Sequence, residues 1–377
     1  MLSCGEPSGD LYAGALTREL RTLIPGLTIA GLGGPQFAAA GGDVLIDYRG
    51  LAVTGFAQIV GALSRLTAAK RVLVENARAQ RPDALIVIDY SGFNLRLARA
   101  MRQLGVPVVY YISPQIWAWR AGRLKTIKEL VERVLVIFPF ESKIYQDAGV
   151  PVEFVGHPLI DLVPHMAPRA AFLHQHGLDG SARTIAVLPG SRTSELRRIL
   201  PDLVSACSLI ARRVPGAQFV LARAPNLDDA LFGPARDAQA AGLRLALVEG
   251  ETDAVLAAAD VALVASGTAT VQTALHDTPM VVVYRLSSLE YTLGRPFVKV
   301  DTFAMVNLIA GERLVPELIQ DAFTPQAVAD EAISILTDDR RASAIRGGLA
   351  RVRQQLGGPG ASRRAAESIA RLLEEHA

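Results

Sequence analysis

The chain has 377 residues, which at ~150 residues per domain suggests about two domains, each with its own core. Its 39 basic and 37 acidic side chains give a net charge of +2, which argues against a protein that binds nucleic-acid phosphate over its whole surface, and its 50% hydrophobic content excludes wholesale disorder. The two cysteines, Cys4 and Cys207, have no partners at zinc-ligand spacing, so neither a disulfide framework nor a structural metal is indicated. We expect a cytoplasmic protein with no signal peptide and no transmembrane segment, because no apolar run reaches the ~20 residues that span a bilayer.

The first half of the chain alternates short apolar runs with helical patterns. Such runs are typical of parallel strands that are buried on both faces by crossover helices. We expect helices over residues 9–24 and 94–104, and strands over residues 28–32, 84–88, 108–112, 134–138 and 153–155. Residues 157–168 carry three prolines and little periodicity, which predicts a hinge between domains.

The second half repeats the pattern and then becomes helical. Its strands are expected over residues 184–188, 218–222, 244–248, 261–264 and 280–284. The sequence therefore predicts an α/β fold of two Rossmann-like, doubly wound domains that face each other across a cleft, over residues 1–157 and 158–340. A helical tail over residues 341–377 is expected to pack back on the first domain or on a dimer partner.

The sharpest local motif is the small-residue turn Ser266-Gly267-Thr268-Ala269-Thr270, between an apolar strand and a helix. Unpaired N–H groups, the helix dipole and the hydroxyl groups of the turn together suit an anion such as a phosphate. An ordinary N-capped helix would have the same appearance. The motif alone leaves this choice open.

A second loop of this kind contains Gly190, Ser191 and Arg192. A guanidinium donates bidentate hydrogen bonds to phosphate oxygens, so Arg192 could clamp a diphosphate, although it could also be a surface arginine after a turn. Two such loops in one domain indicate a nucleotide-diphosphate pocket. Walker and dinucleotide-binding fingerprints are absent from the sequence.

In the first domain, the expected strand 84–88 ends in Asp89, which is followed by the residues YSGFN. A carboxylate at the end of a strand is a candidate general base, and a helix cap or Asx turn is the structural alternative. The loop CGEPSGD places Glu6 and Ser8 where they could hold sugar hydroxyl groups, while Asp10 could merely favour the start of a helix.

Two further segments have both a structural and a functional interpretation. Residues 113–120, SPQIWAWR, hold both tryptophans and precede several cations, which suits a sugar or a phosphorylated amphiphile as well as simple burial. The apolar segment 51–66 could lie on a membrane surface or pack in the core. Its candidate docking residues are Leu51, Val53, Phe56, Ile59, Val60 and Leu63.

The six histidines are dispersed, and neither a zinc-protease pattern nor a nucleophile elbow is present. The sequence therefore gives no support to metal-dependent or serine hydrolysis. We expect no metal and no cofactor. His157, between Gly156 and Pro158, is the histidine of most interest, with stabilisation of a turn as the structural alternative.

Taken together, the motifs resemble the lipid-A-disaccharide synthase family. The matching segments, in order along nearly the whole chain, are GEPSGD at 5–10, GGP at 33–35, LAVTGF at 51–56, SPQIWAWR at 113–120, FPFE at 138–141, GHPL at 156–159, LPGSR at 188–192, SGTAT at 266–270 and NLIAGERLVPEL at 307–318. The resemblance implies a B-type glycosyltransferase fold. It also implies an inverting, metal-independent hexosyltransferase that moves 2,3-diacylglucosamine from its UDP derivative to the 6-hydroxyl of 2,3-diacylglucosamine 1-phosphate, giving a β-1,6 disaccharide and UDP.

On this resemblance Asp89 is the base, and Arg192 with the turn at 266–270 stabilises the departing UDP. Asn307 and Gln272 are implied to contact the UDP-sugar, although the family commonly has Glu at the position of Gln272. The residues implied on the acceptor side are Glu6, Ser8, Gly9 and Glu141. Both substrates carry acyl chains, so the resemblance further implies peripheral contact with the inner face of the inner membrane, and a homodimer is a possible assembly.

Two other kinds of protein remain as alternatives. One is another UDP-N-acetylglucosamine-using transferase or epimerase of the same fold, since the nucleotide pocket alone does not separate these enzymes. The other is a non-catalytic sugar-nucleotide-binding protein. The acceptor-domain motifs disfavour the first alternative, and the presence of both Asp89 and Arg192 disfavours the second.

Overall fold

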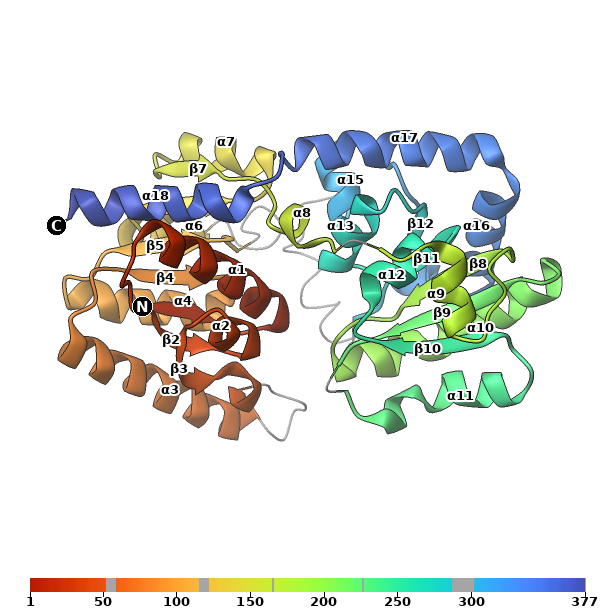
Figure 1. The fold of residues 1–377 in the computed structure, drawn as a ribbon, viewed down its shortest axis with the longest axis horizontal. Coiled ribbons are helices and arrows are strands. Elements are labelled where there is room, and N and C mark those ends of the chain that lie inside the picture. Colours follow the sequence, from red (N-terminus) through yellow and green to blue (C-terminus); the bar gives the residue numbers. More distant parts are fainter. Residues whose placement is uncertain (52–58, 115–121, 165, 226, 287–301, 377) are drawn as a thin grey trace. The chain divides into compact units, whose positions relative to one another are not determined.

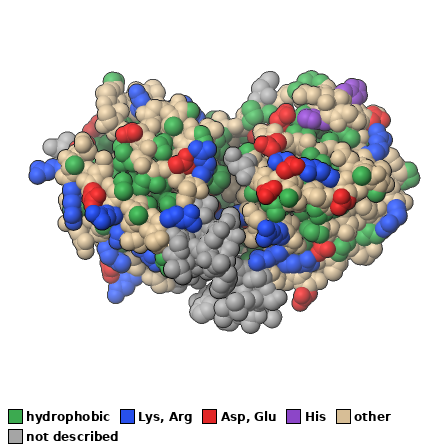
Figure 2. All heavy atoms as spheres, turned by 90° about the horizontal axis from the view of Figure 1, so that it is seen from below, with side chains coloured by type: hydrophobic (Ala, Val, Ile, Leu, Met, Phe, Trp, Pro, Cys, Tyr) green, Lys and Arg blue, Asp and Glu red, His purple; other side chains and the backbone are tan. Residues whose placement is uncertain are grey.

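The computed structural model describes residues 1–51, 59–114, 122–164, 166–225, 227–286 and 302–376. The chain forms two compact units, Met1–Leu162 with Leu356–Ala377, and Val163–Gln355. Each unit is built on its own parallel sheet with helices on its faces (Figure 1). Figure 2 shows Lys and Arg side chains spread over the drawn face with Asp and Glu among them, as the small net charge implies.

The first unit contains a seven-stranded parallel sheet in the order β3-β2-β1-β4-β5-β6-β7. Its strands are β1 (Leu2–Cys4), β2 (Ala30–Gly33), β3 (Asp43–Asp47), β4 (Leu85–Ile88), β5 (Val108–Tyr111), β6 (Arg133–Val136) and β7 (Val152–Phe154). Its helices are α1 (Pro7–Leu23), α2 (Pro35–Ala39), α3 (Ile59–Gln80), α4 (Ser91–Gln103), α6 (Gly122–Leu130), α7 (Pro139–Asp147), α8 (Leu159–Leu162) and α18 (Ala361–Glu375). The strand order reverses direction between β1 and β4, where open α/β sheets bind their ligands.

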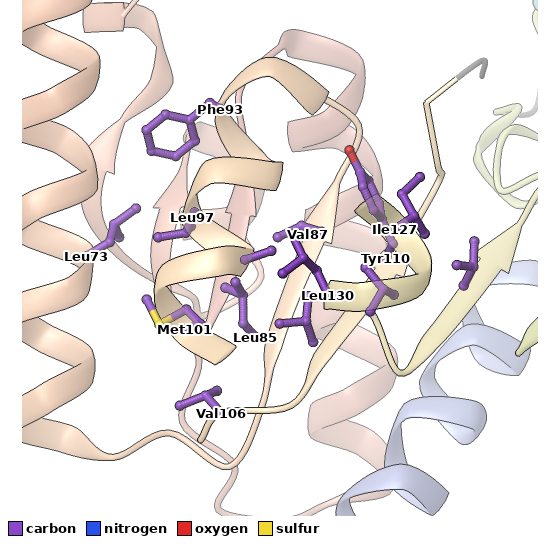
Figure 3. Packing of buried hydrophobic residues seen from close by; sticks show 14 of the residues in the cluster. Leu73, Leu85, Val87, Phe93, Leu97, Met101, Val106, Tyr110, Ile127 and Leu130 are labelled. Atoms are coloured by element: carbon purple, nitrogen blue, oxygen red, sulfur yellow. The ribbon is translucent and has the colours of Figure 1, made fainter. Parts of the chain in front are cut away.

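One buried core of the first unit lies between its sheet and the helices α3, α4 and α6. Leu73 of α3, Leu97 and Met101 of α4, and Val87 and Tyr110 of the sheet belong to one buried cluster (Figure 3). Apolar side chains recur along α4 on the side that faces the sheet, which explains why this segment forms an amphipathic helix. The cluster fixes the strands whose ends carry the candidate acidic residue.

The second unit contains a six-stranded parallel sheet in the order β10-β9-β8-β11-β12-β13. Its strands are β8 (Thr184–Leu188), β9 (Gln218–Arg223), β10 (Leu245–Glu249), β11 (Val261–Ala265), β12 (Met280–Tyr284) and β13 (Glu317–Ile319). Its helices are α9 (Arg169–Gln175), α10 (Thr193–Arg213), α11 (Gly233–Ala240), α12 (Thr252–Ala257), α13 (Thr268–Leu275), α15 (Met305–Ala310), α16 (Pro325–Thr337) and α17 (Asp339–Gln355). Here the order reverses between β8 and β11.

The segment predicted as one helical tail, residues 341–377, is divided between the two units. Helix α17 packs against α13, α15 and α16 in the second unit, because its buried side chains Ile345, Leu349 and Val352 complete that core. Helix α18 packs on α1 in the first unit. Assigning residues 341–355 to the tail was therefore wrong. Two short strands at sheet edges, β3 and β13, were not predicted.

Candidate active site

In the first unit, Asp89 directly follows β4 and has a strained backbone. Its φ is 45°, and that of the next residue, Tyr90, is 42°. Ile112, after the neighbouring strand β5, has a φ of 57°, which is rare for a β-branched residue. Left-handed residues other than glycine cost of order 1–3 kcal/mol each and collect at functional sites. The carboxyl ends of β4 and β5 therefore form the most strained part of the described first unit.

Side chains around Asp89 hold its backbone in this conformation. The Asp89 carbonyl oxygen accepts hydrogen bonds from Asn94 Nδ2 at 2.8 Å and Tyr110 Oη at 2.9 Å, and the Asp89 N–H donates to the Ile112 carbonyl at 3.1 Å. Asn94 and Tyr110 are both fully buried. Sequence reasoning named Asn94 only as a helix start and missed Tyr110, although a polar tip inside an apolar strand was a signal.

The loop after β1 lies against the same end of the sheet. A Cβ added at Gly5 would lie 2.1 Å from Tyr90 Cδ1, so only glycine lets the Tyr90 ring rest on this loop. Burial, and then the negative charge of Glu6, raises the pKa of Tyr90, which places Glu6 beside it. Ser8 is half-buried in the first turn of α1, and Gly9 is buried against Cys4. Glu6 and Asp89 thus belong to adjoining loops at the switch point.

Two predicted polar residues of this unit have clear structural roles. Glu141 is only 3% exposed, and its carboxylate accepts from the Phe138 N–H at 3.4 Å, at the start of α7. Asp10 is 1% exposed, and its carboxylate accepts from the N–H groups of Gly34, Gln36 and Phe37 at the start of α2. Asp10 therefore caps α2 rather than its own helix.

His157 is buried beside the same end of the first unit. Its ring lies between those of Tyr12 and Phe138, with centroid distances of 6.1 and 5.4 Å. Its Nδ1 accepts from the Leu159 N–H at 3.2 Å, which fixes the turn into α8. Burial lowers the pKa of His157 to about 3, so the ring is neutral at physiological pH.

In the second unit, the Gly190–Arg192 loop follows β8 and leads into α10. Glu195 folds back over this helix start, where its carboxylate accepts from the N–H groups of Ser191 at 2.9 Å and Arg192 at 3.2 Å. Gly190 has a φ of 116°, and an added Cβ would lie 2.4 Å from Glu195 Oε2. The side chain of Arg192 is 58% exposed and pairs with Glu195 at 3.4 Å. The loop therefore presents an exposed guanidinium, while its backbone donors serve Glu195.

The turn after β11 has the opposite character. Gly267 and Thr268 are exposed, and a Cβ added at Gly267 would meet nothing within 4 Å. In the described residues no side chain caps α13, so the exposed start of this helix keeps its positive dipole end. Thr270 is buried and donates to the Gly267 carbonyl at 2.8 Å, Ala269 and Gln272 are partly exposed, and Ser266 Oγ donates to the Phe303 carbonyl at 3.1 Å.

Asn307 has a structural role that sequence reasoning did not foresee. It is 1% exposed, its Nδ2 donates to the Val315 carbonyl at 2.9 Å and to Glu317 Oε1 at 2.7 Å, and its Oδ1 accepts from the Val315 N–H. Both amide protons are used, so this side chain orders the chain between α15 and β13 rather than reaching toward a ligand. The prediction that Asn307 contacts the UDP-sugar conflicts with these bonds.

Glu317 completes this arrangement and was missed from the sequence. Its carboxylate accepts from the N–H groups of Phe303 at 2.8 Å and Ala304 at 3.1 Å, besides the bond from Asn307. Phe303 in turn accepts from Ser266. Glu317 thereby fixes the chain beside the turn at Ser266.

The predicted docking segment is only partly within the described residues. Leu51 is 6% exposed and belongs to the core cluster, so its assignment to a free surface was wrong. Leu63 of α3 is 50% exposed. Val53 and Phe56 lie outside the described residues, as do the side chains of Ile59 and Val60 and the segment that holds both tryptophans.

None of the helices described is both long and apolar enough to cross a bilayer. Over the described residues, no group of three or more His, Cys, Asp or Glu side chains is arranged to hold a metal ion.

Two parallel-sheet units, each with its polar loops at the switch point, define the class of B-type glycosyltransferases. Solved structures share this fold: UDP-GlcNAc 2-epimerase from Neisseria meningitidis, bound to UDP-GlcNAc, superposes with a TM-score of 0.70 at 13% identity over 98% of both chains. A family model described as lipid-A-disaccharide synthetase matches residues 1–371. The chain is 42% identical to lipid-A-disaccharide synthase of Myxococcus xanthus, covering 99% of this chain and 97% of that one, and 41% identical to that of Syntrophus aciditrophicus, covering 100% and 98%.

The chain belongs to the lipid-A-disaccharide synthase family. This finding confirms the family, the fold class and the hexosyltransferase activity predicted from the sequence.

Proposed function

We propose that this chain transfers 2,3-diacylglucosamine from UDP-2,3-diacylglucosamine to the 6-hydroxyl of 2,3-diacylglucosamine 1-phosphate. The single observation that carries this proposal is the match to one family over almost the whole chain. The first unit carries the candidate base, Asp89, and the second unit carries Arg192 and the exposed start of α13, so the two units hold the two kinds of group that this reaction requires.

Asp89 is the proposed general base. Direct displacement with inversion needs a group that removes the proton from the 6-hydroxyl as its oxygen attacks the anomeric carbon. A carboxylate at the end of a buried strand, on a backbone held by three hydrogen bonds, suits this role. A positioned base contributes about 10²–10⁴ in rate. Glu6, Ser8, Gly9 and Glu141 remain proposed acceptor-side residues.

Arg192 and the start of α13 are the proposed partners of the leaving UDP. As the bond between the anomeric carbon and the phosphate oxygen breaks, negative charge grows on the diphosphate. The exposed guanidinium and the uncapped helix start are donors that can neutralise it, which is the basis for expecting no requirement for a divalent metal. Gln272 is proposed to meet the ribose, where an amide can both donate and accept.

The test is an assay of the purified protein with both substrates, with and without EDTA. We expect formation of the disaccharide and of UDP to survive EDTA and to fall about 10²–10⁴-fold in Asp89→Asn. Asp83→Asn is the matched control, because Asp83 is exposed at the opposite end of the same strand. An EDTA-sensitive reaction would count against stabilisation by Arg192 and α13. UDP-sugar epimerisation without disaccharide would instead favour the epimerase alternative.

We also propose that α3 contributes to a surface that docks on the cytoplasmic face of the inner membrane. Leu63 is 50% exposed on a helix that also carries Arg71, 78% exposed at its side chain. Exposed apolar groups beside cations favour an anionic lipid surface. Leu63→Ser should weaken co-flotation with anionic vesicles, whereas Leu104→Ser, 37% exposed in the turn after α4, should not. Equal flotation of both variants and the unmodified protein would overturn the assignment of Leu63.

A further inference from the structure

We propose that Tyr110 and Asn94 are positioning residues for Asp89: their side chains hold its carbonyl group, and thereby fix where its carboxylate lies. The inference rests on the proposed function of Asp89 as general base. It concerns two buried residues that do not themselves meet the substrate.

The Asp89 carbonyl oxygen is held from two directions. Tyr110 Oη donates to it from β5 at 2.9 Å, and Asn94 Nδ2 donates from α4 at 2.8 Å. Asn94 Nδ2 has two protons and also lies 3.1 Å from the Ile88 carbonyl and 3.3 Å from that of Ser3, so its shortest bond goes to Asp89. Ser3 Oγ donates to Asn94 Oδ1 at 2.7 Å and fixes the orientation of the amide.

These hydrogen bonds stabilise a backbone conformation that is unfavourable by itself. Asp89 and Tyr90 are consecutive left-handed residues, a conformation that an isolated chain would leave. Because the carbonyl and the side chain are joined through one Cα, release of the carbonyl would let the Asp89 backbone rotate and carry the carboxylate away. Misplacing a reacting group by about 1 Å can cost about 10²-fold in rate.

Within the part of the chain that the structure describes, the hydroxyl group of Tyr110 forms one hydrogen bond, to the Asp89 carbonyl. The ring lies in the apolar cluster with Val87, Ile127 and Leu130, where phenylalanine would pack equally well (Figure 3). A buried hydroxyl requires a partner, and here that partner is the Asp89 carbonyl. Tyr111, the next residue of β5, points to the opposite face of the sheet, and its buried hydroxyl forms no hydrogen bond within the described residues.

Tyr110→Phe tests this assignment, with Tyr111→Phe as its matched control. Both variants keep a buried ring and lose one hydroxyl. We expect Tyr110→Phe to lower kcat about tenfold while KM for both substrates changes less than about twofold, because only the placement of the base is disturbed. Tyr111→Phe should keep kcat within about twofold. Asn94→Ala should lower kcat further than Tyr110→Phe, since it removes the shorter bond.

A double-mutant cycle separates positioning from a general structural effect. If Tyr110 acts through the Asp89 carboxylate, Tyr110→Phe should have no further effect on kcat in an Asp89→Asn background. An equal tenfold loss in both backgrounds would overturn the inference. So would equal kcat values for Tyr110→Phe and Tyr111→Phe while Asp89→Asn is inactive. A fully active Asp89→Asn would instead remove the proposed base, and the inference with it.

Discussion

The two units have the same architecture, yet their switch-point loops are built in opposite ways. In the first unit, the Asp89 backbone is strained and enclosed by buried hydrogen-bonding side chains, Asn94 and Tyr110. In the second unit, Gly267 and Thr268 are exposed, and Arg192 extends into solvent. A base must meet one proton at one position, whereas a diphosphate can be held by helix ends and a long cation that adjust to it. The difference follows the chemistry proposed for each unit.

Within the second unit, removing the exposed cation should have the largest effect. Arg192→Ala should lower kcat about 10²–10³-fold, equivalent to about 2.7–4 kcal/mol of barrier, because one charged donor to the leaving group is lost. Arg192→Lys keeps the positive charge but cannot donate two parallel hydrogen bonds to the phosphate. Its kcat should therefore lie between those of the unmodified protein and Arg192→Ala. Steady-state kinetics with varied UDP-sugar measure the effect. Arg197→Ala, exposed one turn further along α10, is the control, and an equal loss there would show that only the general positive charge matters.

A variant of Glu317 tests whether UDP-sugar binding by the second unit also depends on a side chain that orders a neighbouring loop. Its carboxylate binds two N–H groups and the Asn307 amide. Glu317→Ala should raise the KM for the UDP-sugar about tenfold and lower the free energy of unfolding by about 2 kcal/mol, because these groups lose their acceptor. The KM for the acceptor should not change. Glu312→Ala, at a residue whose side chain is 59% exposed, is the control. A changed acceptor KM would contradict the division of roles between the units.

The sequence predicted most of the fold because buried parallel strands are apolar throughout. Of the central strands, all except β1 (Leu2–Cys4), for which no range was predicted, were located to within one or two residues. The edge strands β3 and β13 were missed, since β3 is only partly buried and reads DVLID, and β13 has three residues. Short edge strands depend on their neighbours rather than on their own pattern.

For the site, the sequence predicted positions at strand ends but not the partners of each side chain. Asp89 and Arg192 follow buried strands, which apolar runs make visible. The roles of Asn307 and Glu317 depend on hydrogen bonds across a fold-specific loop, which no spacing rule reveals. Leu51 belonged to an apolar run with two possible environments, and the core proved to be the correct one.

The pH dependence of stability that His157 causes reports how well this end of the first unit excludes water. Its pKa is lowered from 6.5 to about 3, so below pH 6.5 the unfolded chain binds a proton that the folded chain does not. Stability is therefore complete above pH 6.5 and is lost as the pH falls toward 3, by about 2 kcal/mol at pH 5. His157→Asn, whose Oδ1 can still accept from Leu159, should lack this loss. Denaturant unfolding of both proteins at pH 7.5 and pH 5 measures it, and parallel losses would show that His157 stays solvated.

The smallest expected effect concerns Asp10, and it tests whether every acidic residue near this switch point acts on substrate. The three N–H groups bound by its carboxylate all belong to the start of α2. Asp10→Asn should lower the free energy of unfolding by about 1 kcal/mol, because an amide nitrogen replaces one accepting oxygen, while kcat stays within about twofold. Asp43→Asn, exposed in the same unit, controls for the lost charge. A large loss of kcat at unchanged stability would mean that this carboxylate leaves α2 when substrate binds, and the first unit would then supply a second mobile acid beside its fixed one.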